Sequence, residues 1–230
     1  MTRTSFGFRV LKGLITAIFM PLYRLRSSGE ARIPPEGAVV LAANHVSYWD
    51  AIFLQIACPR PIRWMIDEQY YRLPILHALF RWIGCIPVKE AGNRAALDTA
   101  LAALKAGEVV GIFPEGFLSR TGRMGRPRTG VSTLTARSGG AAVPAYLRGA
   151  FFSWHKGQWF PRLTRVEVRF GDPLYLRRRE DIDRVAMQRF AEELMEAIKG
   201  LYGHEKPRGI RAGDQPPPGA RDGTERRGKP

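Results

Sequence analysis

The sequence is poor in the residues that build disulfide frameworks and metal centres. It has two cysteines in 230 residues, Cys58 and Cys85, and no CxxC pair. Each lies in an apolar stretch, so we expect two reduced core residues and a reducing compartment. No histidine has a second histidine at ligand spacing, which argues against a zinc site. We therefore expect neither a bound metal nor a resident cofactor.

A run long enough to span a membrane is also missing. The longest candidate, residues 10–23, is interrupted by Lys12 and Pro21, and a span needs roughly 20 mostly apolar residues. A poor signal-peptide cleavage site follows it. Because basic residues flank it, we expect residues 1–28 to form a helix in the interface of an anionic membrane, peripheral or monotopic, at the cytoplasmic face. The alternative is an ordinary N-terminal helix packed on the domain.

Acidic residues are scarce relative to basic ones. The chain has 36 Lys and Arg against 21 Asp and Glu, a formal net charge of +15. Such an excess attracts polyanions, which include nucleic acid, an anionic membrane surface and phosphorylated substrates. No zinc finger, RNP-like aromatic block or obvious helix-turn-helix is present. We therefore expect no nucleic-acid partner, and a basic nucleic-acid-binding module stays open as an alternative.

Short apolar runs alternate with amphipathic segments along the chain. Strands are expected at 38–44, 61–66, 85–89, 109–113, 141–147 and 165–171. Helices are expected at 50–57, 73–84, 93–106, 130–140 and 180–202. This alternation predicts a layered α/β fold over residues 29–203, with a largely parallel central sheet flanked by helices. Residues 204–230 are rich in Pro, Gly and charge, so we expect them to form a disordered tail.

Two polar residues, His45 and Asp50, interrupt the apolar pattern after the first of these strands. On one continuous helix, their spacing would turn the side chains about 140° apart. They meet only if the chain bends between strand and helix, with Asp50 in the first helical turn. Asp50 would then hold one ring nitrogen of His45 and leave the other free as a general base. A structural histidine beside a helix cap is the alternative.

A second polar cluster, "PEGFLSRTGRMGRPR", follows the strand at 109–113. The carboxyl ends of parallel strands share one edge of a sheet, so Glu115 and Gly116 are expected to face the same crevice as His45. Glycines let backbone N–H groups approach an anion, and arginine binds phosphate bidentately. The basic residues are Arg120, Arg123, Arg126 and Arg128, and Lys89, after another strand, would extend the same positive wall. A solvated basic surface is the alternative.

No protein nucleophile accompanies the candidate base. The sequence has no G-x-S-x-G elbow, and neither cysteine has an obvious basic partner. A covalent acyl-enzyme is therefore not expected. A histidine–aspartate pair without a nucleophile suits the activation of a substrate hydroxyl.

Four blocks resemble, in the same order, those of the glycerolipid acyltransferases typified by 1-acylglycerol-3-phosphate acyltransferase. "NHVSYWD" resembles NHxxxxD, and "GCIPVK" resembles the second block with Lys89 where arginine is usual. "FPEGFLS" resembles FPEGTRS, and "AAVPAYL" resembles the fourth block, around Pro144. The resemblance covers roughly residues 30–175 and implies the glycerol-3-phosphate acyltransferase-like fold.

The resemblance also implies a reaction at a membrane phospholipid surface. His45 would take a proton from a hydroxyl of a lysophospholipid acceptor, whose oxygen would attack the thioester of acyl-CoA or acyl–acyl carrier protein. Asp50 would orient His45. The residues implied to hold the acceptor's glycerophosphate are Glu115, Gly116, Ser119 and Lys89. The block around Pro144 is implied to lie on the acyl-donor side.

The chain departs from the family pattern at Phe117 and Leu118, which replace Thr-Arg. Arg120 would take the place of the missing arginine, or the acceptor head group differs. The longer pattern resembles the acyltransferase portion of bifunctional 2-acylglycerophosphoethanolamine acyltransferases, so an acceptor with a substituted phosphate is an alternative. A membrane-surface module without chemistry is another.

Overall fold

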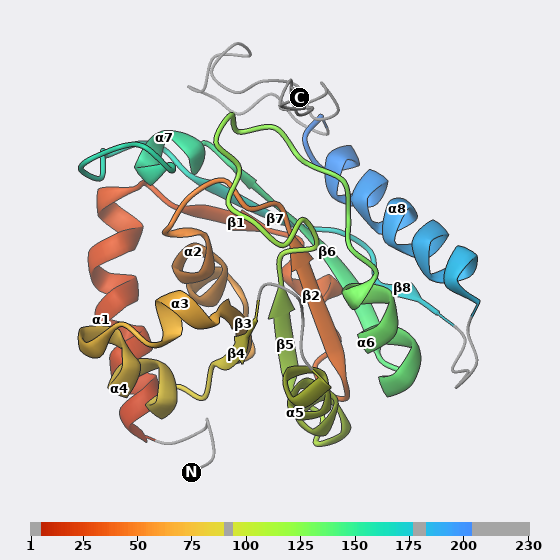
Figure 1. The fold of residues 1–230 in the computed structure, drawn as a ribbon. Coiled ribbons are helices and arrows are strands. Elements are labelled where there is room, and N and C mark those ends of the chain that lie inside the picture. The colour runs from red at the N-terminus through yellow and green to blue at the C-terminus, as the bar shows by residue number, and fades with distance from the viewer. Residues whose placement is uncertain (1–5, 90–93, 177–182, 204–230) are drawn as a thin grey trace, which may run out of the picture.

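An eight-stranded sheet forms the centre of the molecule (Figure 1). The computed structural model describes residues 6–89, 94–176 and 183–203. The strands are β1 (Arg26–Ser28), β2 (Val39–Ala43), β3 (Ile62–Asp67), β4 (Ile86–Val88), β5 (Val109–Ile112), β6 (Ala141–Arg148), β7 (Glu167–Phe170) and β8 (Leu174–Tyr175). Their order is β1-β7-β6-β2-β5-β3-β4, with β8 paired to β6. β6 is antiparallel to β7 and β8, and the other pairs are parallel.

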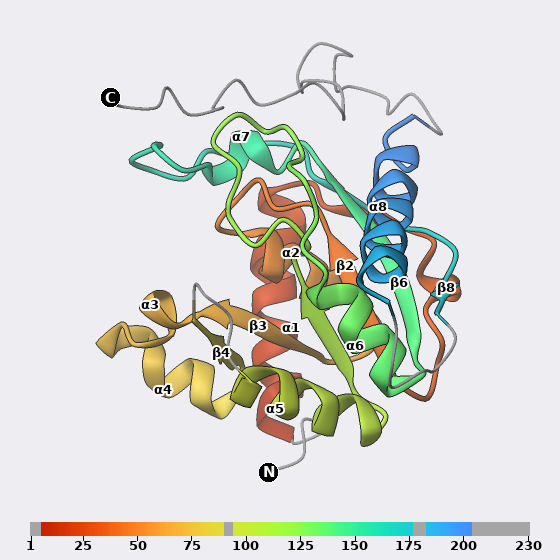
Figure 2. The same ribbon diagram turned by 45° about the vertical axis from the view of Figure 1, so that its right-hand side comes forward.

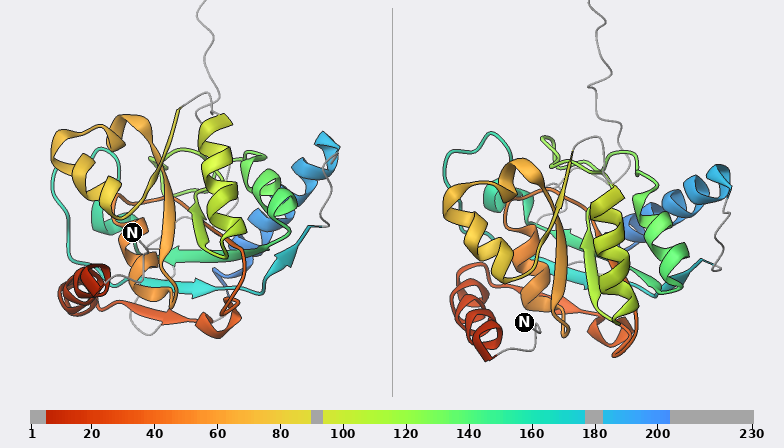
Figure 3. Two further views of the ribbon diagram at one scale, coloured as in Figure 1. Left: turned by 90° about the horizontal axis from the view of Figure 1, so that it is seen from below. Right: turned by 60° about the horizontal axis from the view of Figure 1, so that its bottom comes forward.

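Helices form a layer on each side of this sheet (Figures 2 and 3). One layer consists of α1 (Phe6–Leu22), α2 (Asp50–Ala57), α3 (Glu68–Tyr71) and α4 (Pro74–Trp82). The other consists of α5 (Arg94–Lys105), α6 (Gly130–Ser138) and α8 (Arg184–Gly200). Two short elements complete the fold, the 3-10 turn η1 (Glu30–Arg32) and α7 (Phe151–Trp154).

The central strand β2 shows why the sheet needs two helix layers. All of its residues are buried. Val39 and Leu41 belong to the core that α2 covers, whereas Val40 and Ala42 belong to the core that α5, α6 and α8 cover. Successive side chains of a strand point to opposite faces. A strand that is apolar at every position is therefore stable only between two apolar layers, as in parallel sheets.

The predicted α/β architecture and its largely parallel sheet are confirmed. The sequence did not predict the shortest elements, because each is too short to show a hydrophobic period. These elements are β1, β8, η1, α3 and α7. The last helix begins at Arg184, not at 180, because the carboxylate of Asp183 caps it by accepting from the Val185 N–H. Residues 180–182 lie outside the described residues, and so does the segment 204–230, for which a disordered tail is predicted.

The strand predicted at 165–171 differs from expectation in its burial. Its alternation predicts a half-buried strand, but Val168, Arg169 and Phe170 of β7 are all buried. Arg169 is polar and still covered, because its guanidinium donates to the Leu201 carbonyl at the end of α8. The alternation therefore separates an apolar core face from a face on which a charged side chain is buried and hydrogen-bonded.

The expectation about the cysteines is confirmed, since Cys58 and Cys85 are both free and buried. Among the helices of the described residues, none combines the length and the hydropathy that crossing a bilayer requires.

The N-terminal helix α1 has two apolar sides. On the inner side Phe19 packs edge-on against Phe53 of α2, with ring centroids 6.0 Å apart. The Lys12 ammonium donates to the Cys58 carbonyl at 2.7 Å, which fixes the helix to the end of α2. The outer side exposes large apolar residues at four-residue spacing, which are Phe6, Val10, Leu14 and Ile18. The inner side of α1 is thus packed on the domain, as the alternative for this helix expects. The prediction of a membrane-interface helix concerns the exposed outer side.

Candidate active site

After β2, the side chain of Asn44 fixes the position at which the chain leaves the sheet. Asn44 is buried, and its side-chain amide bonds Leu147 of β6 in both directions. The Leu147 N–H donates to Oδ1 at 2.8 Å, and Nδ2 donates to the Leu147 carbonyl at 3.2 Å. This bridge prolongs the β2–β6 ladder by one residue. His45 therefore emerges at the carboxyl edge of the sheet, and the chain then turns into α2 at Asp50.

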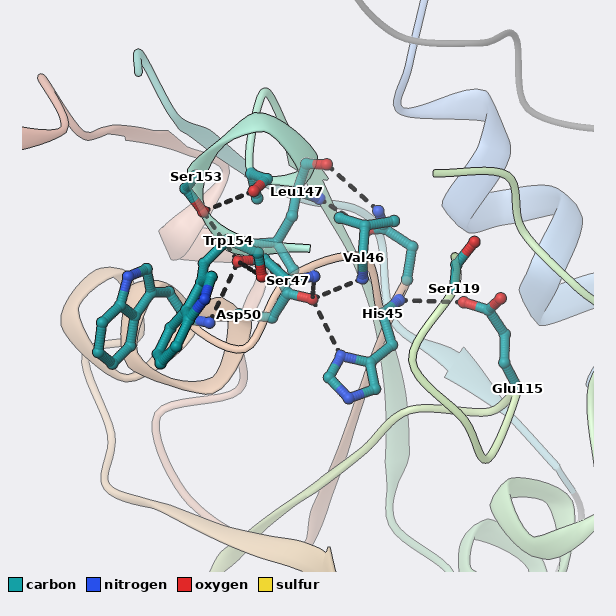
Figure 4. A network of polar contacts seen from close by, with 12 residues as sticks. His45, Val46, Ser47, Asp50, Glu115, Ser119, Leu147, Ser153 and Trp154 are labelled. Carbon is teal, nitrogen blue, oxygen red and sulfur yellow. Dashed lines mark hydrogen bonds and ion pairs between the residues drawn. The ribbon is translucent and has the colours of Figure 1, made fainter. Parts of the chain in front are cut away.

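His45 and Asp50 meet across that turn, as the sequence predicts (Figure 4). Nδ1 of His45 lies 3.0 Å from Oδ2 of Asp50, which also accepts the N–H groups of Val46 at 2.6 Å and Ser47 at 2.7 Å. A carboxylate oxygen only accepts, so Nδ1 carries the proton and Nε2 keeps its lone pair. Figure 4 shows Nε2 pointing away from Asp50. The His45 side chain is 22% exposed and that of Asp50 is 0% exposed.

The Asp50 carboxyl lies in a desolvated site with compensating donors. Burial raises the pKa of Asp50, and the hydrogen bonds from His45, Ser47 and Val46 oppose this rise. Asp50 is also the first residue of α2, where the unpaired N–H groups of a helix favour a negative charge. We infer a carboxylate here, because three donors converge on one of its oxygens. Such a carboxylate stabilises the imidazolium that forms when His45 takes a proton.

An aromatic stack holds the plane of the His45 ring. Phe113 lies against the imidazole with centroids 3.9 Å apart and planes at 8°. Trp64 of β3 stacks on the other side of Phe113, at 5.2 Å and 12°. Gly111 makes room for this arrangement, since a Cβ at that position would lie 2.6 Å from the Trp64 ring. The glycine inside the predicted strand at 109–113 was the available sequence signal, because such glycines mark close approach.

The segment after β5 holds the main chain of His45 from both sides. Oε1 of Glu115 accepts the His45 N–H at 3.0 Å, and the Ser119 N–H donates to the His45 carbonyl at 2.8 Å. Oε2 of Glu115 accepts the Gly125 N–H at 2.7 Å. The Ser119 hydroxyl is buried and donates to the Arg123 carbonyl at 2.8 Å.

These contacts give Glu115 and Ser119 a different place from the one that the resemblance implies. Both side chains are buried, and the carboxylate is directed at backbone N–H groups rather than at the crevice. A carboxylate would also repel a phosphate. In this structure the two side chains position the main chain of His45 and the loop that follows, and the expected contact with glycerophosphate stays a prediction. The sequence could not show this, because it does not fix on which side of the turn a side chain lies.

Glu115 is desolvated enough to shift its protonation. Burial raises its pKa to about 6, against the opposing effect of the Gly125 and His45 N–H groups. The nearby Asp50 carboxyl adds to the rise. A carboxylate that is held beside the main chain of the base is thus sensitive to pH close to neutrality.

Arginines lie along the exposed side of the same segment, which we call the arginine loop (residues 119–128). Gly116 has φ +75°, and a Cβ there would lie 2.7 Å from Nε of Arg128. The Arg128 side chain therefore lies directly over Gly116, next to Glu115, and it is exposed. Arg120 is exposed as well. This geometry brings Arg128 and Gly116 together, as expected of an anion-binding element.

Lys89 has a more distant place at the same edge of the sheet. It follows β4, whose neighbour β3 separates it from β5, and its side chain is exposed. Lys89 and the arginine loop lie at the same carboxyl edge of the sheet, but Lys89 is not part of that loop. Beside Arg128 an open groove of about 650 Å³ runs toward α8, and its lining includes Thr129, Arg184, Gln188, Arg189 and Glu192.

Helix α7 supports the His45 loop (residues 44–49) from the other side and was not foreseen. The hydroxyls of Ser47 and Ser153 lie 2.8 Å apart, and the Tyr48 N–H donates to the Trp154 carbonyl at 3.0 Å. The rings of Trp49 and Trp154 pack with centroids 4.8 Å apart. The sequence offers no signal for these contacts, because the partners lie about a hundred residues apart and α7 has only four residues.

The serine hydroxyls on the two loops around His45 and the Cys58 thiol are buried. The hydroxyls of Ser47 and Ser119, on the loops around His45, are buried and hydrogen-bonded to other groups. Burial raises the pKa of the Cys58 thiol, which disfavours a thiolate. Pro144, from the fourth block, is buried inside β6, opposite Ala42 of β2. The site therefore presents Nε2 of His45 at the same edge of the sheet as a loop with exposed arginines.

The family model for acyltransferases matches residues 24–148, which include β2, the His45 loop and the arginine loop. This match covers more than half of the chain. The chain therefore belongs to the acyltransferase family.

Curated relatives carry related names. The chain is 27% identical over 151 residues to a chloroplastic 1-acyl-sn-glycerol-3-phosphate acyltransferase of Arabidopsis thaliana, which covers 64% of this chain and 42% of the relative. It is 26% identical over 145 residues to the 1-acyl-sn-glycerol-3-phosphate acyltransferase of Bacillus subtilis, which covers 62% of this chain and 70% of the relative. The chain thus matches less than half the length of the plant relative.

A solved structure shares the fold. The crystal structure of the 1-acyl-sn-glycerophosphate acyltransferase PlsC from Thermotoga maritima superposes with a TM-score of 0.69 at 20% identity. The superposition covers 86% of this chain and 80% of that chain. It confirms the predicted fold.

Proposed function

We propose that the protein transfers a fatty acyl group from an acyl thioester to a free hydroxyl of a lysophospholipid such as 1-acylglycerol-3-phosphate. Family membership and the names of the relatives support this proposal. The observation that carries it is the 3.0 Å contact between Nδ1 of His45 and Oδ2 of the fully buried Asp50. That contact leaves Nε2 as a base at an open edge of the sheet.

The reaction needs one proton transfer in each direction. Nε2 of His45 takes the proton from the acceptor hydroxyl as its oxygen forms a bond to the thioester carbonyl carbon. The carbon–sulfur bond then breaks, and the leaving thiolate takes the proton back from the imidazolium. Asp50 stabilises the imidazolium between these steps, and Phe113 keeps the ring plane fixed. The donor, acyl-CoA or acyl–acyl carrier protein, is a co-substrate, and no resident cofactor takes part.

The acceptor phosphate is assigned to the exposed side of the arginine loop. Arg128 over Gly116 forms the centre of this subsite, and Arg120 is a second exposed arginine of the same loop. Guanidinium groups bind phosphate through paired charge-assisted hydrogen bonds. Lys89 adds positive charge at the same edge from a greater distance, and the groove beside Arg128 offers room for the phosphates of the donor.

A substituted head group remains the second candidate for the acceptor. Phe117, which stands where the family has threonine, is 49% exposed next to Gly116. An apolar ring at this point suits a head group that carries more than a bare phosphate. Acceptors of both kinds therefore belong in one test.

The lipid nature of the acceptor requires access to a membrane surface. The exposed row on α1 provides an apolar face, and residues 6–28 contain basic residues and no Asp or Glu. Such a helix suits the interface of an anionic bilayer. We propose that α1 places the crevice at the cytoplasmic surface of the membrane, where its acceptor resides.

The test is acyl transfer from labelled acyl-CoA and acyl–acyl carrier protein to a panel of lysophospholipids, with lysophosphatidic acid and 2-acylglycerophosphoethanolamine as the two key acceptors. We expect product with at least one of them and none from the His45→Ala variant. If no pairing of thioester and acceptor turns over in the wild type, the proposal is wrong and the inactive membrane module gains support.

A further inference from the structure

The segment between α7 and β7 carries a second group of exposed apolar side chains. Trp159 is 90% exposed, Phe160 is 77% exposed and Leu163 is 68% exposed. Side chains of this size lose favourable free energy when they are left in water. Two aromatic rings at the tip of one loop therefore need a reason, and we call residues 155–163 the aromatic loop.

Hydrogen bonds within the aromatic loop hold the backbone conformation in which these side chains are exposed. Nε2 of Gln158 donates to the carbonyls of Phe160 and Ser153, and the Trp154 indole donates to the Gln158 carbonyl. The Arg162 N–H donates to the Ser153 carbonyl at 2.7 Å and closes the loop at its base. These bonds hold the backbone around the tip while the rings of Trp159 and Phe160 point outward.

The return of the aromatic loop passes the C-terminal end of α1, whereas its tip extends away from that helix (Figures 1, 2 and 3). The Val166 N–H donates to the Tyr23 carbonyl at 3.0 Å, and the Arg26 N–H donates to the Val166 carbonyl at 3.1 Å. These two bonds join the end of α1 to the return of the loop. The loop and α1 are therefore joined in a fixed arrangement, in which the exposed apolar row of α1 and the loop tip are two separate apolar groups.

The charged residues of these two segments are all basic. Residues 155–166 contain no Asp or Glu and neither do residues 6–28. The exposed cations around the two apolar groups are Arg9, Arg24, Arg26, Lys156 and Arg162. A protein partner with an apolar patch would not demand this uniform charge, whereas an anionic lipid surface does. Tryptophan with flanking cations is the composition found at membrane–water interfaces.

We propose that the aromatic loop is a second membrane contact, which inserts Trp159 and Phe160 into the interface of an anionic phospholipid bilayer in addition to the contact of α1. The inference rests on the proposed function in one respect, that the acceptor is drawn from the bilayer. It adds a contact that comes from a different part of the chain than the N-terminal helix.

The base of the aromatic loop explains why such a contact matters for the reaction. Ser153 and Trp154 are the residues that support the His45 loop through Ser47, Tyr48 and Trp49. Insertion of the tip therefore fixes the distance and tilt of His45 relative to the lipid surface. Two contacts on separate elements define an orientation that one helix, free to roll about its axis, does not.

Binding of the full-length protein to phosphatidylglycerol vesicles tests this inference. In the double variant Trp159→Ala/Phe160→Ala, the dissociation constant for the vesicles is expected to rise at least about tenfold. The reason is that the two rings no longer bury apolar surface in the bilayer. Tyr175→Ala removes an aromatic side chain that is 67% exposed on β8, away from α1, and serves as the matched control with no expected change. An unchanged dissociation constant for the double variant contradicts the inference.

Quenching by brominated phospholipids places the tip directly. Trp159→Phe keeps an apolar ring and removes the reporter, so it is expected to lose the quenching that the wild type shows, whereas Trp64→Phe, which removes a buried indole, is expected to keep it. Equal quenching in the wild type and Trp159→Phe overturns the inference.

Turnover of a dispersed short-chain acceptor separates the two proposals. We expect the double variant to keep it, and if the wild type also lacks it, the acyltransferase proposal fails while the vesicle result stands.

Discussion

The His45 loop and the arginine loop follow neighbouring strands, β2 and β5, and differ in how far their polar side chains are exposed to solvent. In the first, Asn44, Ser47 and Asp50 are buried and bonded within the protein. In the second, Arg120 and Arg128 expose their guanidinium groups. Both loops end at the same edge of the sheet, so the contrast lies in their side chains and not in their position.

The difference separates two kinds of task. A base gains from a fixed tautomer and a desolvated counter-charge, because its geometry must be ready before the substrate arrives. A phosphate site gains from exposed cations that can form charge-assisted hydrogen bonds to the ligand. Changes in the His45 loop should therefore act on kcat, and changes in the arginine loop should act on the KM of the acceptor.

The largest effect in this comparison is expected from Asp50→Asn. The asparagine oxygen still accepts the Val46 and Ser47 N–H groups, so the loop keeps its shape while the negative charge is lost. Without that charge the imidazolium is not stabilised, and we expect kcat to fall about 10²–10³-fold with little change in KM. Steady-state kinetics check this, with near-UV circular dichroism as the control for folding. A loss below threefold would contradict the role of Asp50.

A smaller effect on a different parameter is expected from Arg128→Ala. Loss of a charge-assisted contact to phosphate should raise the KM of the acceptor about 10–100-fold and leave kcat within a few-fold. Arg94→Ala is the matched control, because this arginine is 93% exposed on α5 and has only a 3.8 Å ion pair. If the KM of the thioester rises instead, Arg128 belongs to the donor side of the site.

The smallest effect concerns stability and Glu115, which links the two loops. Its pKa is about 6 in the folded protein against an ordinary value of 4.5. The raised pKa means that its stabilising contribution is complete below pH 4.5 and is lost as the pH rises through 6, by up to about 2 kcal/mol.

Urea unfolding of the wild type and Glu115→Gln across pH 4–8 isolates this contribution, because the glutamine does not titrate. We expect the stability of the wild type relative to the variant to decrease between pH 4.5 and 6.5 and then stay level. A constant difference, or one that increases with pH, is incompatible with a desolvated Glu115.

The sequence was sufficient for the features that have a repeat or a strict local spacing. The apolar runs predicted the strands, and the distance between His45 and Asp50 required the bend that is present between β2 and α2. The pair could be inferred because both partners lie within one short turn. Gly116 and Arg128 also come from one loop, whose glycines and arginines indicated an anion site.

The features that the sequence did not predict depend on tertiary packing. Whether Glu115 faces the crevice or the main chain of His45 is decided by the fold of the arginine loop, and no residue pattern encodes it. The stack of Trp64 on Phe113 joins separate strands, and Ser153, which follows β6, contacts Ser47, which follows the neighbouring strand β2. Such contacts leave no periodic pattern and no fixed spacing in the sequence, so only the three-dimensional structure shows them.

The most direct test of the central claim is the rate of acyl transfer by His45→Ala as a function of pH. If Nε2 of His45 removes the proton from the acceptor, kcat should fall about 10²–10⁴-fold near neutral pH. It should recover in part as the pH rises, since hydroxide can then replace the base. A variant that keeps its rate within a few-fold of the wild type, with no such recovery, would show that the histidine–aspartate pair is structural.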